Sequence, residues 1–313
     1  MAAFPTIRTV GIMSPGEMGH AIGRRLREHG LRVITCLQGR SARTAALAAA
    51  AGIDDTGDDA TLVQEADVLL AVLVPAEALG LARRIALALR TTGATLLYVD
   101  CNAISPQTAR QIEQVVTAAG ARFVDAGIIG GPPAPGRAGP RIYASGTHAA
   151  EFAQLREYGL DIRIIDGDAG QASGLKMCYA ALTKGLTALA TELLVAAELM
   201  GLSEPLRAEL RSSQPDLLTW IERQAPGMPP KAYRWVGEME EIAATFGALG
   251  LTPKLHQGAA ELYRFVAQTP LGEETPEQRR RGQTLDDLIA VLAGELQTRV
   301  AGDSAAPTGS RSG

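Results

Sequence analysis

The stretch GIMSPGEMG (residues 11–19) has the residue types that hold the pyrophosphate of a dinucleotide. It follows a short apolar run and opens a segment with helical spacing, so backbone N–H groups and the helix dipole would face the phosphates. Gly16 would let a phosphate approach the backbone, and Gly19 would let the helix pack against the strand. Ser14 stands where such turns usually carry their first glycine, so its backbone must adopt a geometry that a Cβ allows, beside the rigid Pro15. A structural turn that binds no nucleotide is the alternative.

The residues after the second apolar run bear on the choice of cofactor. A carboxylate about 20 residues beyond the turn would accept a hydrogen bond from the ribose 2′-hydroxyl of NAD. The segment CLQGRS at residues 36–41 has no acidic residue there. Arg40 is suited to pair with a 2′-phosphate, and Ser41 is suited to donate to it at a helix N-terminus. The segment therefore favours NADP(H) over NAD(H), with a surface arginine that caps the next helix as the alternative for Arg40.

A sheet must position these residues, because the first half of the chain alternates apolar runs with helical patterns at short intervals. The expected strands lie at 9–13, 31–36, 68–74, 95–100, 123–128, 141–145 and 161–165. Helices are expected between most of them, including one from Ser105-Pro106 and one from Thr147. The pattern predicts an α/β dinucleotide-binding domain of the Rossmann type over 1–167, with a doubly wound, mostly parallel sheet.

The pattern changes from about Gly170, where some thirty residues run without proline. Such a segment predicts a helix of about 45 Å, and every later apolar segment is also helical in pattern. We therefore predict a long interdomain helix, an all-helical substrate and dimerisation domain over 168–301, and a flexible tail over 302–313. One subunit would hardly cover so long an apolar helix, so we expect a homodimer through the helical domain.

Composition excludes several classes of protein. The net charge is −4 without a sustained basic stripe, which argues against nucleic-acid binding. No uninterrupted apolar run approaches the roughly 20 residues of a membrane-spanning helix, and the first residues lack a signal-peptide pattern, so a cytoplasmic protein is expected. The three cysteines are far apart and odd in number, which favours buried thiols over disulfides. Neither the cysteines nor the four histidines have the spacing of metal ligands, and no metal is expected.

Five motifs in order resemble the β-hydroxyacid dehydrogenase superfamily, which includes 6-phosphogluconate dehydrogenase and 3-hydroxyisobutyrate dehydrogenase. GIMSPGEMG is similar to its GFIGLGxMG turn, VLVPAEAL to the loop that lies along the cofactor, and VDCNAISP to D-x-S-T-x-x-P. DAGIIGG is similar to the substrate loop DAPVSGG, and GQASGLKMCYA to GxGxxxKxxNN. RWVGEMEEIAATF further resembles the helical domain of a branch known only as phosphogluconate dehydrogenase-like. The resemblance spans nearly the whole chain and implies hydride transfer between a nicotinamide and a small molecule.

The resemblance also implies a set of cofactor-binding residues in the turn, after the second strand and in the next two loops. These are Gly11, Met13, Ser14, Pro15, Gly16, Glu17, Met18, Gly19, Gln38, Arg40, Ser41, Val74, Pro75 and Asn102.

By the same resemblance Lys176 is the catalytic lysine. A hydride that moves to or from C4 of nicotinamide must be matched by a proton at the substrate oxygen, and a partly desolvated lysine can supply or accept that proton. Lys176 lies early in a mostly apolar helix after a Gly-rich turn, a setting that suits partial desolvation. The alternative is a lysine that extends its amine into water from a helix start.

The site departs from the family pattern at several positions. Tyr179 and Ala180 replace the asparagines that follow the lysine, and Ile129 replaces the serine of the substrate loop. Asn102 stands in the slot of the first hydroxyl of D-x-S-T and is a candidate to contact nicotinamide or substrate. These changes make the pocket less polar, and they put a simple 3-hydroxy acid substrate in doubt. The expected substrate-binding residues are Asn102, Ile129, Gly130, Gly131, Tyr179, Ala180, Lys184, Trp235 and Glu238.

Residues of the helical domain leave alternatives open. Glu238 and Glu241 share a helix face and would suit an amine substrate, although a solvated helix face is the alternative. Trp235 is a candidate substrate contact or a core residue. Three functions follow: an NADP(H)-dependent oxidoreductase acting on a hydroxy acid or alcohol, an imine reductase, or a sensor that binds NADPH without catalysis.

Overall fold

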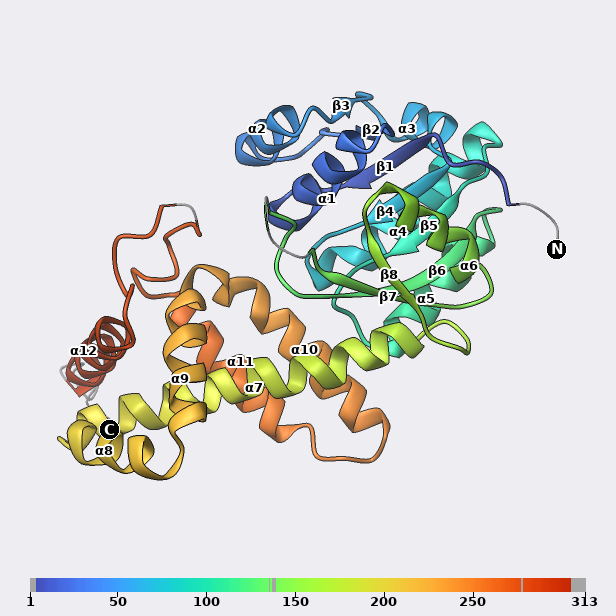
Figure 1. Cartoon of the computed structure of the whole chain (residues 1–313). Coiled ribbons are helices and arrows are strands. Elements are labelled where there is room, and N and C mark those ends of the chain that lie inside the picture. Colours follow the sequence, from blue (N-terminus) through green and yellow to red (C-terminus); the bar gives the residue numbers. More distant parts are fainter. Residues whose placement is uncertain (1–3, 135, 137–138, 277, 305–313) are drawn as a thin grey trace, which may run out of the picture. The chain divides into compact units, whose positions relative to one another are not determined.

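The computed structural model describes residues 4–134, 136, 139–276 and 278–304, which divide into two compact units (Figure 1). The first unit lies within 1–179 and 244–251, and the second within 180–243 and 252–313. The first unit is an α/β domain, and the second is helical. Both parts of the predicted fold class are confirmed.

One eight-stranded sheet forms the centre of the first unit, in the order β3-β2-β1-β4-β5-β6-β7-β8. β7 is antiparallel to β6, and the other neighbouring pairs are parallel. The sheet is therefore doubly wound and mostly parallel, as predicted. The strands are β1 Thr9–Met13, β2 Arg32–Thr35, β3 Asp54–Asp55, β4 Val68–Ala71, β5 Leu97–Asp100, β6 Arg122–Ile129, β7 Arg141–Ser145 and β8 Asp161–Ile164.

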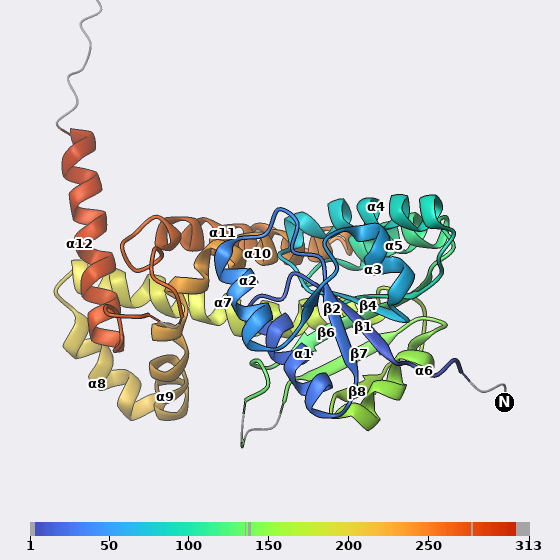
Figure 2. The same cartoon turned by 90° about the horizontal axis from the view of Figure 1, so that it is seen from above.

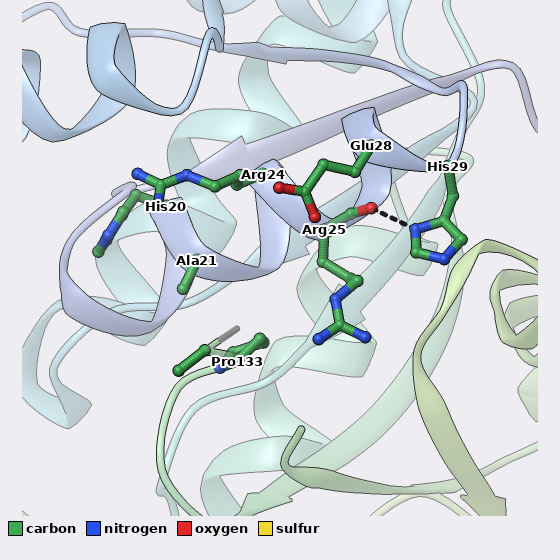
Figure 3. Close-up of a pocket in the computed structure, with 8 residues that line it drawn as sticks. His20, Ala21, Arg24, Arg25, Glu28, His29 and Pro133 are labelled. Atoms are coloured by element: carbon green, nitrogen blue, oxygen red, sulfur yellow. Dashed lines mark hydrogen bonds between the residues drawn. The ribbon is translucent and has the colours of Figure 1, made fainter. Parts of the chain in front are cut away.

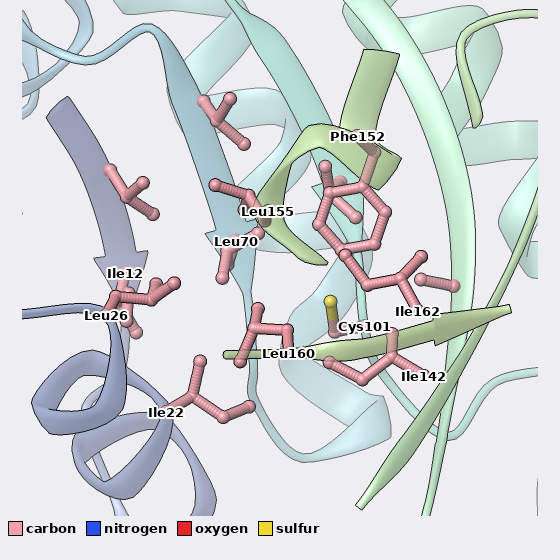
Figure 4. Packing of buried hydrophobic residues seen from close by; sticks show 14 of the residues in the cluster. Ile12, Ile22, Leu26, Leu70, Cys101, Ile142, Phe152, Leu155, Leu160 and Ile162 are labelled. Atoms are coloured by element: carbon pink, nitrogen blue, oxygen red, sulfur yellow. The ribbon is translucent and has the colours of Figure 1, made fainter. Parts of the chain in front are cut away.

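Helices cover both faces of this sheet because successive side chains of the buried strands point to opposite faces. On one face α1 (Glu17–Glu28), α2 (Ala42–Ala50), α6 (Ala149–Phe152) and the 3₁₀ helix η1 (Ala153–Tyr158) contribute to one apolar cluster. Figure 4 shows Ile22 and Leu26 of α1 and Phe152 of α6 packed near the strand residues Ile12 and Leu70. The opposite face carries α3 (Asp59–Glu65), α4 (Pro75–Thr92) and α5 (Pro106–Thr117) (Figure 2).

Two local predictions were wrong, and two short elements were missed. The strand expected over 68–74 ends at Ala71, and residues 72–74 form the loop before α4. The short strand β3 and the helix α3 were not predicted. Cys178 is exposed, whereas Cys36 and Cys101 are buried thiols as expected.

The long helix α7 (Gln171–Leu199) is present as predicted, but the division between the two units lies within it, after Tyr179, and not at 167/168. By length and composition alone α7 could cross a membrane, although no such segment was expected from the sequence. Half of its most apolar 18-residue window is buried, as in the core helix of a soluble protein.

The second unit consists of helices. After α7 come α8 (Ser203–Ser213), α9 (Pro215–Gln224), the 3₁₀ helices η2 (Ala225–Gly227) and η3 (Pro229–Lys231), α10 (Ala232–Ala248), α11 (Lys254–Ala267) and α12 (Leu285–Ser304). Because α12 continues to Ser304, the first three residues of the predicted tail are helical. The remaining tail residues, 305–313, lie outside the described residues.

Candidate functional site

The carboxyl ends of four neighbouring strands meet at one edge of the sheet. In the strand register Met13 lies beside Ala71, Ala71 beside Asp100, and Asp100 beside Asp125. Ligands of open α/β sheets bind outside this edge. The loops after β1, β4, β5 and β6 carry the predicted residues Ser14, Pro15, Gly16, Val74, Asn102, Gly130 and Gly131, so the fold brings these residues to one edge of the sheet.

The turn after β1 has the form that a phosphate-binding loop needs. Ser14 has a φ of 64°, a left-handed conformation that glycine adopts more readily, and its carbonyl accepts from the N–H of Gly16 at 2.7 Å. A Cβ on Gly19 would lie 2.8 Å from the Ser14 carbonyl oxygen, so glycine is required there for α1 to approach the turn. A Cβ on Gly16 would meet nothing nearer than 3.9 Å, so the protein itself leaves that side open. Ser14 therefore takes the backbone geometry of the glycine it replaces.

Gly16 is also the N-cap of α1, and as a glycine it has no side chain to accept a hydrogen bond from the N-terminal N–H groups of the helix. Beside this end of the helix, the Nδ1 atom of His20 lies 2.6 Å from the Gly16 carbonyl oxygen. A hollow of about 310 Å³ opens along the same helix (Figure 3). It is lined by His20, Ala21, Arg24, Arg25, Glu28, His29, Pro133 and Ala134. Sequence reasoning did not group these residues, although helical spacing places several on one face of α1.

The turn after β2 presents the residues predicted to select the cofactor. The N–H of Arg40 donates to the Leu37 carbonyl at 2.9 Å, and Gly39 takes a positive φ of 73°. Ser41 caps α2 by accepting from the N–H of Thr44 at 3.2 Å. Asp55, which sequence reasoning missed, holds this turn by accepting from the Leu37 N–H at 3.0 Å.

Gln38 is exposed in this turn, and Arg40 is half-buried. Arg43 lies in the first turn of α2, three residues after Arg40, and adds a second positive charge. A cationic turn next to a helix N-terminus suits an anionic group.

Asn102 braces two loops at the carboxyl edge. Its side chain is buried, its carbonyl accepts from the N–H of Leu73 at 2.5 Å, and its amide donates to Asp100 at 2.9 Å. The brace positions the loop that ends at Val74, the N-cap of α4, and at Pro75, its first residue. Contact between Asn102 and the cofactor or substrate stays a prediction.

Lys176 lies against the end of β6, within the first unit. Its Nζ atom donates to the Ile128 carbonyl at 2.7 Å, and the side chain is half-buried. A Cβ on Gly127 would come within 2.9 Å of both the Ala172 carbonyl oxygen and the Lys176 Cβ. Glycine at 127 therefore allows α7 to pack directly on β6 and holds the lysine amine at the carboxyl edge.

A buried carboxylate that sequence reasoning did not single out caps the start of α7. The Oδ2 atom of Asp125 accepts from the N–H groups of Gly170 at 2.8 Å and Ser173 at 3.0 Å, and from the Ser145 hydroxyl at 3.0 Å. Its Oδ1 atom accepts from the Ser173 hydroxyl at 2.5 Å. The Ser145 oxygen in turn accepts from the N–H of Ala172 at 3.0 Å. These bonds satisfy the orphan donors of the helix that carries Lys176.

The Asp125 carboxylate also affects the pKa of the Cys101 thiol. Burial raises the pKa of the Cys101 thiol well above its ordinary value, and the carboxylates Asp100 and Asp125 raise it further. Cys101 therefore stays a neutral thiol in the core.

Two sequence families match the chain. Residues 9–158 match the NAD binding domain of 6-phosphogluconate dehydrogenase, and residues 197–266 match a domain of unknown function, DUF1932. The chain is 32% identical to the conserved protein MTH1747 of unknown function, a structure that is similar to 3-hydroxyacid dehydrogenases. That match covers 83% of this chain and 96% of the other, with a TM-score of 0.61. This chain belongs to the β-hydroxyacid dehydrogenase superfamily. As a member, it is an NAD(P)-dependent oxidoreductase.

More distant members and neighbours share the fold. A 3-hydroxyisobutyrate dehydrogenase from Mycobacterium tuberculosis, solved with L-serine, is 21% identical and has a TM-score of 0.67; the match covers 92% of this chain and 99% of the other. A variant of an imine reductase from Myxococcus stipitatus, solved with NAD+, is 18% identical and has a TM-score of 0.52; the match covers 93% of this chain and 100% of the other. At these identities the likeness concerns the fold alone.

The residues expected to contact the substrate differ in exposure. Ile129 and Ala180 are buried, whereas Gly130 and Gly131 are exposed at the end of β6 and Tyr179 is 44% exposed. Gly130 has a φ of 120°, a conformation that an L side chain rarely adopts. The backbone conformation therefore favours glycine at position 130, and contact of this loop with substrate stays a prediction.

The second unit brings together three other predicted residues. Lys184 of α7 forms an ion pair with Glu238 of α10, and its amine lies 5.2 Å from the ring centre of Trp235. Trp235 packs edge-on against Tyr263 with ring centres 5.2 Å apart, and the Tyr263 hydroxyl donates to the Lys184 carbonyl at 2.5 Å. Burial raises the pKa of the Tyr263 phenol. Lys184 and Glu238 largely neutralise each other, which makes the cluster a brace between helices; their contact with substrate stays a prediction.

Proposed function

We propose that this chain is a cytoplasmic NADP(H)-dependent oxidoreductase that transfers a hydride between nicotinamide and a small hydroxy acid or alcohol, or its carbonyl counterpart. The position of Lys176 carries the proposal. Its amine lies at the carboxyl edge of the sheet, held at 2.7 Å by the Ile128 carbonyl, at the same edge as the turn after β1. A reaction that moves a hydride and a proton needs such a proton-transfer group beside the cofactor site.

Each part of the proposed reaction is assigned to particular residues of the chain. Bound NADP(H) would supply or accept the hydride at C4 of its nicotinamide. The turn at Ser14 to Gly19 would hold the pyrophosphate on the N-terminal N–H groups of α1. Lys176 would give a proton to the substrate oxygen in reduction and take it in oxidation. Asp125 fixes the start of α7 and thereby the position of that amine.

Replacing Arg40 by alanine should weaken NADPH binding about 10- to 100-fold and leave NADH binding nearly unchanged. The loss corresponds to one or two charge-assisted hydrogen bonds to the 2′-phosphate, which NADH lacks. Titration of the purified protein with each nucleotide, followed by nicotinamide fluorescence, measures both affinities.

The ratio of the two affinities is an internal control, because a general loss of structure would weaken NADH binding as well. An unchanged ratio in Arg40→Ala would contradict the choice of NADP(H). Failure of the unmodified protein to bind either nucleotide would contradict the whole proposal, including the fit of the Ser14 turn.

Reduction of a C=N bond is a second candidate function. Ile129 and Ala180 are buried apolar residues where the superfamily motifs carry a serine and an asparagine, so neither side chain can donate a hydrogen bond to the carboxylate of a hydroxy acid. An imine substrate gains its proton on nitrogen and is often cationic, and it needs no carboxylate donor. Retention of Lys176 favours the first candidate, and a comparison of both substrate classes separates the two.

We also propose that the protein is a homodimer through its helical part. Leu175, Leu182 and Leu189 of α7 are 41%, 66% and 58% exposed and recur every seven residues, which places them in one stripe along the helix. An exposed apolar stripe on a long helix is typical of a subunit interface.

Replacing both Leu182 and Leu189 by glutamate should convert the dimer to a monomer, because burying two carboxylates in an apolar interface is unfavourable. Light scattering at micromolar concentration measures the mass. Leu87→Glu is the matched control, since Leu87 is 60% exposed and lies on a different helix, α4. A monomeric unmodified protein would overturn the proposal.

A further inference from the structure

Arg141 is a basic residue that neither the sequence motifs nor the proposed mechanism uses. It is the first residue of β7, where the strand register places it between Ile129 of β6 and Asp161 of β8. Because β7 runs antiparallel to β6, its first residue lies at the carboxyl edge of β6, beside the substrate loop. The position is one where a side chain can meet a ligand.

The face of the sheet to which Arg141 points follows from strand geometry. Gly127 of β6 faces α7, because its Cβ would come within 2.9 Å of the Lys176 Cβ. Gly127 pairs with Tyr143, and Ile129 pairs with Arg141, two residues further along each strand. Side chains two residues apart in a strand share a face. Arg141 and Ile129 therefore lie on the same face of the sheet as Lys176.

The guanidinium of Arg141 is not fully satisfied within the protein. Its Nε atom is buried and makes no hydrogen bond within the residues that the structure describes. Its acidic neighbour in the register, Asp161, is bound by Arg163 through two hydrogen bonds of 3.1 and 2.9 Å, and the charge of Arg141 adds to that of Arg163 in lowering the pKa of this carboxyl. A buried charged donor without an acceptor is costly, and such groups in native proteins point to a missing partner.

We propose that Arg141 binds the carboxylate of the substrate, so that the substrate is a small hydroxy acid or its keto counterpart. This inference rests on the proposed function, since it assigns a residue to the same site. A guanidinium matches a carboxylate through two parallel hydrogen bonds. The side chain of Ile129, which pairs with Arg141 across β6 and β7, has no hydrogen-bond donor. Arg141 would therefore hold the carboxylate of the substrate, and the substrate hydroxyl would be directed to Lys176.

The test is binding of matched acids and amides to the complex with NADP+. Calorimetry with 3-hydroxypropionate, 3-hydroxyisobutyrate and glycerate, each against its primary amide, compares the protein with Arg141→Met, Arg141→Lys and Arg83→Met. Arg83 is exposed on α4 and controls for net charge. We expect at least one acid to bind about 10- to 100-fold more weakly to Arg141→Met, its amide to bind equally to both, and Arg141→Lys to fall between.

A second readout separates binding from a structural role. Because the Arg141 Nε is unsatisfied, Arg141→Met should keep or raise the urea midpoint of the ligand-free protein and leave NADP+ affinity unchanged. A lower midpoint, equal binding of the acids by Arg141→Met, or no binding of any acid by the unmodified protein would overturn the proposal. Acid binding without turnover would count against the proposed reaction and leave the role of Arg141 intact.

Discussion

Replacing Lys176 by methionine should lower kcat for oxidation of short 3-hydroxy acids with NADP+ by about 10³-fold, within the range for loss of a general acid or base. Methionine keeps the length and apolar stem of the side chain, which packs over Gly127, and removes only the amine that donates to Ile128. NADPH affinity should be unchanged, because the phosphate-binding turn is formed by other residues. Initial rates at saturating NADP+ and a fluorescence titration measure the two effects.

Lys254→Met is the matched control, since Lys254 is an exposed lysine at the start of α11. The unmodified protein and Lys176→Met should also be tested for reduction of 2-methyl-1-pyrroline with NADPH. Equal reduction of this imine with and without Lys176 would favour the C=N function over the hydroxy acid function. If the unmodified protein binds NADPH but turns over neither substrate class, the non-catalytic sensor becomes the better description.

The fold followed from the sequence because its signals are local. Alternating apolar runs and helical patterns predicted the parallel sheet, and thirty residues without proline predicted α7. The end of β4 was misplaced for a physical reason. Residues 72–74 continue the apolar run of the strand, but the Asn102 carbonyl takes the N–H of Leu73, which turns that segment into the loop before α4. No local pattern reports a hydrogen bond to a residue 29 positions away.

The candidate site was only partly visible in the sequence. The turn at Ser14 and the amine of Lys176 could be found, because each has a motif or a distinctive setting. The cap of α7 could not be found in the same way, because Asp125 lies in β6 and the N–H groups it binds are 45 and 48 residues away. A carboxylate inside an otherwise apolar strand was the one available signal, since such a group is buried only with partners.

Asp125→Ala should lower the free energy of unfolding by about 3 kcal/mol, the cost of leaving several buried donors without an acceptor. The N–H groups of Gly170 and Ser173 and the hydroxyls of Ser145 and Ser173 would all lose their partner. Asp125→Asn should cost less, because the remaining side-chain oxygen still accepts hydrogen bonds. It should still cost some stability, because the new NH₂ group faces other donors. Urea unfolding followed by circular dichroism measures the three proteins.

The control is Ser105→Ala, which removes the side-chain cap of α5 and should cost about 1 kcal/mol. The larger cost at Asp125 follows from the number of donors it serves and from their burial. Asp125→Ala should also lower kcat and leave NADPH affinity unchanged, because the Asp125 cap fixes the helix start from which Lys176 reaches the end of β6. Equal stability losses at Asp125 and Ser105 would show that α7 is held chiefly by its apolar packing, and Asp125 would then lose its role in positioning the lysine.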